Sequence, residues 1–249
     1  MLAAFMTALW ISGATCIMTL GGGLLALRFR AYRGPVLAFC AGALIAGALM
    51  DVIPEALHLL EATHSRFDHH HLLIACSLGF LFFYLFEHAA HHSGGQDHPS
   101  HYNHPCQAGA WGAAGIGVHS FFDGVAIGGA FQAGNEIGWI VALAVILHKF
   151  ADGISTVGVM LGTQHSTTAT TAMLSVTALA PIAGAVTQTA FVVPAPVLAL
   201  TLGWFAGVFL YLGASSLLPA AHEAGHSRWL PLATLAGVAF VYVAQLLTE

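Results

Sequence analysis

Long uninterrupted apolar runs constrain the fold of this chain more than any other feature. A helix needs about 20 mainly apolar residues to cross a bilayer, and eight segments meet this length. They are residues 2–27, 35–60, 71–90, 109–134, 136–162, 169–192, 196–220 and 228–248. None shows the short apolar–polar alternation of a membrane β-barrel. We therefore predict an all-α integral membrane protein, with eight transmembrane helices in a single membrane domain over residues 1–249.

The low charge content supports this prediction and excludes other classes of protein. Charged residues make up 7% of the chain, against roughly 25% of an ordinary soluble domain. Six lysines and arginines provide no basic surface for nucleic acid. The four cysteines form no Cys-x-x-Cys pair, so we predict no disulfide framework. The first run starts at Leu2 without basic residues before it, and we interpret it as a retained helix rather than a signal peptide.

The arginines predict the orientation in the bilayer, because cytoplasmic loops are enriched in basic residues. With eight spans, the loops after the first, third, fifth and seventh lie on one side. The arginines of that side are Arg28, Arg30, Arg33 and Arg228. The other side carries only Arg66. We therefore expect both termini outside the cytoplasm, in a plasma or inner membrane, and the polar histidine-rich loop 91–107 inside.

A weak similarity between two segments of the sequence suggests an inverted repeat. The second run closes on Asp51-Val-Ile-Pro54-Glu55, and the seventh closes on Ser216-Leu-Leu-Pro219-Ala220. These two runs cross the bilayer in opposite directions, as an inverted-topology repeat requires. Only the first copy keeps its two carboxylates.

Two copies of the motif His-x-x-x-Asp-Gly lie near the middle of neighbouring runs. They begin at His119 and at His148. Residues i and i+4 share one face of a helix, so each run presents an imidazole beside a carboxylate. Charges cost a few kcal/mol at the bilayer centre and usually mark a functional site there, and these groups are good ligands for a divalent transition metal. The predicted ligands are His119, Asp123, His148 and Asp152.

Other polar groups leave alternatives open. The intramembrane imidazoles and carboxylates could also serve only as hydrogen-bonding partners that hold the bundle together, although two matching pairs at one depth favour a metal site. Asp51 and Glu55 share a helix face. They fit an accessory relay for metal or protons, and they fit equally well an ordinary helix end bent by Pro54.

The histidines after the third run form a second candidate metal-binding region. Neutral imidazoles at this density can capture metal loosely, although a plain polar linker would look the same. They are His88, His91, His92, His98, His101 and His104. A smaller cluster on the opposite side comprises His64, His69, His70 and His71.

The two motifs, the eight runs and the histidine-rich loop together resemble the ZIP (Zrt/Irt-like protein) family of divalent metal transporters. The resemblance covers nearly the whole chain and extends to Pro54-Glu55. It implies import of Zn²⁺ toward the cytoplasm and a ligand set formed by the two His/Asp pairs. It also implies a homodimer, and movement of a transport bundle against a scaffold around a fixed midplane site, as in alternating access.

Two positions depart from the pattern of family members with a two-metal centre. Those members tend to carry Asn after the first motif histidine and an acid after the second, where this chain has Ser120 and Lys149. The departure implies a single bound ion. Ser120 and Lys149 are possible accessory residues of the site, and the Lys149 ammonium either neutralises carboxylate charge there or is led by its long stem into a water-filled cavity. Both motif carboxylates are also Asp, where many members have Glu.

Two function classes remain on the residues alone. The first is a transporter, with a divalent metal as cargo and no cofactor. Two imidazoles and two carboxylates suit Zn²⁺, and also Fe²⁺, Mn²⁺, Co²⁺ and Cd²⁺. The second is a membrane metalloenzyme of the desaturase or hydroxylase type, because His88-x-x-His91-His92 resembles one histidine box. Such enzymes need several boxes and the chain shows no second one, so we predict a transporter and not an enzyme.

Overall fold

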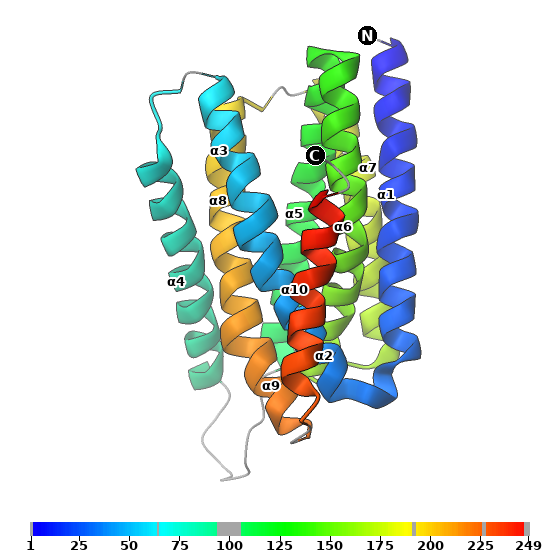
Figure 1. The fold of residues 1–249 in the computed structure, drawn as a ribbon, viewed down its shortest axis with the longest axis vertical. Coiled ribbons are helices and arrows are strands. Elements are labelled where there is room, and N and C mark those ends of the chain that lie inside the picture. The colour runs from blue at the N-terminus through cyan, green and yellow to red at the C-terminus, as the bar shows by residue number, and fades with distance from the viewer. Residues whose placement is uncertain (1, 64, 94–105, 191–192, 226–227, 247–249) are drawn as a thin grey trace.

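The protein is a bundle of long helices (Figure 1). The structure, a computed structural model, describes residues 2–63, 65–93, 106–190, 193–225 and 228–246, and no strand occurs among them. The elements are α1 Leu2–Arg28, η1 Arg30–Tyr32, α2 Arg33–Ala46, η2 Gly47–Val52, α3 Ile53–Ala62, α4 His69–Ser93, α5 Cys106–Ala133, α6 Asn135–Gly162, α7 Thr167–Ala190, α8 Ala195–Tyr211, η3 Leu212–Leu217, α9 Leu218–Glu223 and α10 Leu230–Leu246.

The predicted all-α membrane fold is confirmed. Seven helices among the described residues are long and apolar enough to cross a bilayer, and α10 is a shorter apolar helix of 17 residues. The second and seventh of these eight are composite, because α2, η2 and α3 follow one another without a break, as do α8, η3 and α9. Helix α4 continues to Ser93, so His91 and His92 belong to its last turn and not to the predicted loop.

The helices pack as two groups. In the first group α1, α5, α6 and α7 contact one another, and in the second α2, α3, α4, α8, α9 and α10 do so. The two groups meet mainly where α2 and α10 pack against α6. Both His-x-x-x-Asp-Gly motifs lie on helices of the first group, whereas Asp51 and Glu55 lie on the second.

Each of the four closest helix pairs crosses at two glycines, one from each helix. At every one of these glycines an added Cβ would collide with a backbone carbonyl oxygen of the partner helix. The pairs are Gly22 with Gly153 (α1–α6), Gly124 with Gly184 (α5–α7), Gly79 with Gly207 (α4–α8) and Gly42 with Gly237 (α2–α10). Small residues permit such close contact between membrane helices. The glycine of each His-x-x-x-Asp-Gly motif is therefore a packing residue that sets the ligand helix against its neighbour.

Alanine at Gly153 is expected to destabilise the protein by about 1–3 kcal/mol, the usual cost of overpacking. The added methyl would meet the carbonyl oxygen of Thr19 on α1. Thermal unfolding in detergent measures the effect. Gly13→Ala is the matched control, because Gly13 lies on α1, as Thr19 does, but has open space around it. This variant should be neutral or stabilising, because alanine favours helix. Equal melting of the two variants would contradict this role of Gly153.

The two similar segments carry the same backbone irregularity. The π-helical turn η2 ends two residues before Pro54, and η3 ends two residues before Pro219. Proline has no N–H, so Met50 O, four residues before Pro54, loses its usual helical donor. The side-chain amide of Gln245 on α10 donates a hydrogen bond to this oxygen. A π turn frequently marks a functional position in a helix, and here it contains Asp51.

Candidate metal centre

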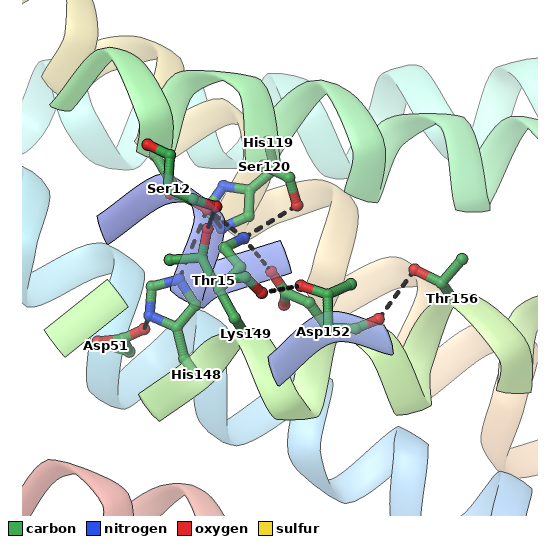
Figure 2. Close-up of polar contacts among 11 residues, drawn as sticks. Ser12, Thr15, Asp51, His119, Ser120, His148, Lys149, Asp152 and Thr156 are labelled. Carbon is green, nitrogen blue, oxygen red and sulfur yellow. Dashed lines mark hydrogen bonds and ion pairs between the residues drawn. The ribbon is translucent and has the colours of Figure 1, made fainter. Parts of the chain in front are cut away.

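The two predicted His/Asp pairs face each other in the middle of α5 and α6 (Figure 2). One ligand atom from each of four side chains lies within 4.8 Å of the others. The four side chains are His119, Asp123, His148 and Asp152. Asp123 lies between the imidazoles, since its Oδ2 is 3.5 Å from His119 Nε2 and 3.6 Å from His148 Nε2. No other set of three His, Cys, Asp or Glu side chains converges in this way within the described part of the chain.

The separations suit ligands of one metal ion. Zinc binds nitrogen and oxygen at about 2.0–2.1 Å, so two ligands of a tetrahedral ion lie roughly 3.4 Å apart. The distances of 3.5 and 3.6 Å from Asp123 to the two histidines match this edge and are too long for good hydrogen bonds. The cluster is buried, with His119 2% and Asp123 4% exposed.

Aromatic rings of the second helix group hold one of the imidazoles. The His119 ring contacts Phe209 edge-on at a centroid distance of 4.8 Å and Phe205 at 5.7 Å, both on α8. The two imidazoles lie 6.0 Å apart, centroid to centroid. The orientation of this ligand therefore depends on how the two helix groups sit against each other.

Lys149 lies inside the cluster and not in a water-filled cavity. It is 0% exposed, and its Nζ forms ion pairs with Oδ2 of both Asp123 and Asp152. Nζ also donates a hydrogen bond to Ser120 Oγ at 2.9 Å (Figure 2). The long side chain thus does not lead its charge out to water. The ammonium neutralises part of the carboxylate charge and shares Asp123 Oδ2 with any ion bound to the histidines.

Asp51 joins the cluster from the second helix group. Its Oδ2 lies 2.9 Å from Nδ1 of His148 (Figure 2), while Nε2 of that imidazole faces Asp123. Asp51 therefore contacts the cluster from within the continuous helix of α2, η2 and α3 and not from a helix end. A carboxylate on the far nitrogen fixes the ring orientation and tautomer of a metal-binding histidine.

A small cavity connects the cluster to Glu55. Its volume is about 40 Å³, enough for a water-sized occupant. Asp51, Glu55, His119, Asp123 and His148 supply its polar lining. Asp152 does not line this cavity and instead contacts Lys149. Three of the four predicted ligands thus face the cavity, and both predicted accessory carboxylates lie along it.

The other candidate histidines that the structure describes lie at the two ends of α4, away from this centre. His88 is exposed near the end of α4, while His98, His101 and His104 lie outside the described residues. His69, His70 and His71 are exposed at the start of α4, where Asp68 Oδ1 accepts the backbone N–H of His70 and His71. The His71 side chain, 2.7 Å from the same oxygen, lowers the pKa of Asp68 to about 2. Asp68 therefore caps the start of α4, and His64, the fourth histidine predicted for this cluster, lies outside the described residues.

Buried hydroxyl groups around the site were missed by the sequence reasoning. Ser12 and Thr15 of α1 and Thr156 of α6 are fully buried. Thr15 Oγ1 donates to Ser12 O, and Thr156 Oγ1 donates to Asp152 O, each at 2.8 Å. The sequence pattern could have predicted them, because a serine or threonine in the middle of an apolar run usually faces a neighbouring helix.

The fold and the cluster define a polytopic membrane protein with a buried His/Asp cluster between two of its helices that could hold a metal ion. The family model of the ZIP zinc transporters matches residues 110–244, more than half of the chain and both motifs. The chain belongs to this family, and hence to a family of transporters rather than to the histidine-box enzymes.

A curated relative supports the same assignment. Zinc transporter zipt-7.1 of Caenorhabditis briggsae is 29% identical over 147 residues. The aligned region covers 52% of this chain and 37% of that protein, so the chain spans little more than a third of the relative's length.

Proposed function

We propose that this chain transports a divalent transition metal, Zn²⁺ in the first place, across a membrane. The convergence of two imidazoles and two carboxylates within 4.8 Å at the middle of the bundle carries the proposal. Membership of the ZIP family supports metal as the cargo, and the name of the related zinc transporter supports zinc. The purified protein in liposomes should take up Zn²⁺ without chemical turnover. If the protein took up none of the ions Zn²⁺, Fe²⁺, Mn²⁺, Co²⁺ and Cd²⁺, the proposal would be wrong.

Alternating access around a fixed site is the mechanism that the two helix groups support best. All four proposed ligands lie on α5 and α6 of the first group, whereas Asp51 and the rings that hold His119 belong to the second. A displacement of one group against the other would therefore part Asp51 from His148 and open the cavity lined by Glu55. The ligand set of α5 and α6 would move as one unit with its ion.

The proposed direction is toward the cytoplasm. Arg28 closes α1 and Arg228 lies just before α10, at the same end of the bundle (Figure 1), and the positive-inside rule places that end in the cytoplasm. The cavity with Asp51 and Glu55 would then open outward. A homodimer in a plasma or inner membrane is the remaining part of the proposal. Accessibility of single cysteines placed at Arg66 and Arg228 tests the orientation, and the mass in detergent tests the dimer.

Asp51→Asn is expected to weaken zinc binding about 10–100-fold, the usual cost of losing a carboxylate that orients a metal-binding histidine. The asparagine keeps the size of the side chain and removes the charge that faces His148 Nδ1. Calorimetric zinc titration of the purified protein measures the change. Glu61→Gln, an exposed residue of the same composite helix, is the control. Identical affinity in the two variants would exclude a positioning role for Asp51.

Replacing the histidines of the last turn of α4 and of the segment after it with serine should leave maximal zinc uptake largely intact. His91, His92, His98, His101 and His104 are changed together, because a histidine tract binds metal without fixed geometry. The variant should differ mainly at low zinc concentration. Loss of uptake in liposomes, at equal protein content, would instead make the loop an obligatory part of the path.

A further inference from the structure

A wide apolar groove runs along the outside of the bundle at the seam between its two helix groups. Its volume is about 670 Å³, within the range of small-molecule sites. Helices α1 and α6 of the first group and α2 and α10 of the second provide its walls and floor. The large side chains that line it include Leu25, Phe29, Tyr32, Phe39, Phe150 and Phe240. Such a surface fits hydrocarbon chains.

One end of the groove is positively charged from both sides. Arg28 ends α1 on one wall, and Arg228 precedes α10 on the other; both side chains are exposed. Arg30 and Arg33 lie in the same corner, where they donate hydrogen bonds to Thr167 Oγ1 and Gly162 O. None of these four arginines forms an ion pair within the described ranges. Arg28 and Arg228 therefore place positive charge at this end of the groove, where Glu223 at the end of α9 is the exposed carboxylate.

Aromatic residues mark the same end as the level of the lipid headgroups. Tyr32, which lines the groove, is 66% exposed, and Trp229 at the start of α10 is 58% exposed. Tyrosine and tryptophan gather at the membrane–water interface. The apolar part of the groove therefore lies at the depth of acyl chains, and the arginines lie at the depth of phosphate groups.

We propose that this groove binds an anionic phospholipid. Its acyl chains would lie against Phe39, Phe150 and Phe240, and its phosphate would meet Arg28 and Arg228. Basic pockets between transmembrane helices select anionic headgroups in this way. Any phospholipid could fill the apolar part, so selection for negative charge is the specific property of the site.

A second copy of the chain fits the groove less well. In a two-fold contact each copy presents the same patch to the other. Such a contact through this groove would bring two sets of exposed arginines together, which is costly without carboxylates between them. A homodimer would therefore use another face.

The bound lipid would span the seam between the two groups. Phe150 and Ile154 in its floor lie on α6, and Phe150 directly follows Lys149 of the metal cluster. Phe39 and Phe240 on the opposite side belong to α2 and α10, and the rings of Phe150 and Phe240 lie 5.6 Å apart. The lipid would thus contact both groups beside the ligand helix.

Native mass spectrometry of the full chain in mild detergent tests the proposal without any transport measurement. The probes are phosphatidylglycerol and phosphatidylcholine with identical acyl chains. The wild type should bind phosphatidylglycerol preferentially. Arg28→Ala with Arg228→Ala should reduce this preference by roughly fivefold for each arginine. Arg28→Lys with Arg228→Lys should largely retain it.

Two further variants make the test specific. Ala236→Trp, which places a large side chain in the groove lining, should weaken binding of both lipids, whereas Arg66→Ala at the other end should change neither. Equal binding of the two lipids by the wild type would overturn the proposal, as would an unchanged preference in the double alanine variant. Disulfide-linked dimers of Ala236→Cys that exclude lipid would assign the groove to a second copy instead.

Discussion

Alanine at His148 is expected to lower zinc uptake into proteoliposomes by more than 100-fold. Loss of an outer carboxylate already costs about 10–100-fold in affinity, and His148 would be a direct ligand. Its imidazole also joins the two helix groups, since Nδ1 faces Asp51 and Nε2 faces Asp123. The variant should therefore lose the ion and the contact that orients the site. Radioactive zinc uptake at matched protein content measures the effect.

Two controls separate loss of the site from loss of the protein. His88→Ala changes an exposed histidine of α4 and should transport normally. His148→Ala should still elute as a single species in size-exclusion chromatography, since its helix crossing depends on Gly153 and not on the imidazole. Near-normal uptake by His148→Ala would end the model of a midplane site.

Removing the charge of Lys149 is expected to make the stability of the protein depend on bound metal. Without the ammonium, the carboxylates of Asp123 and Asp152 lose their ion pairs. Breaking a buried pair by removing one partner costs about 3–5 kcal/mol. A divalent ion would restore the balance, so Lys149→Ala should melt earlier in EDTA, regain stability with zinc, bind zinc more tightly and release it more slowly.

Lys149→Met is the matched variant for this prediction. Methionine fills most of the buried volume without charge, so it should reproduce the tighter binding with less loss of packing. Lys149→Glu supplies an acid at the position where relatives with two metals carry one, and we expect it to recruit a second ion. Calorimetry and the zinc content per chain measure affinity and stoichiometry. Unchanged values in all three variants would show that Lys149 does not balance charge in the site.

The fold class and the placement of each His/Asp pair on one helix face could be predicted from the sequence, because both depend on local rules. The length of an apolar run specifies a spanning helix, and the spacing of His119 and Asp123 or of His148 and Asp152 places each pair on one face. The similarity around Pro54 and Pro219 was also local, and the π turns before both prolines give it a structural meaning.

Contacts between different helices, in contrast, could not be predicted from local patterns. The contact of Asp51 with His148 joins residues far apart in the chain and depends on the π turn that contains Asp51. The spacing of residues likewise does not determine where the Lys149 side chain points, because its long stem could reach either water or a carboxylate. In the structure the side chain is buried and pairs with Asp123 of α5. The groove beside Phe150 lies between α1, which packs mainly against α6 and α7, and α10, which packs mainly against α2. Contacts between helices depend on where whole helices cross. These crossings lie at glycines, and no local sequence pattern identifies which helix each glycine meets.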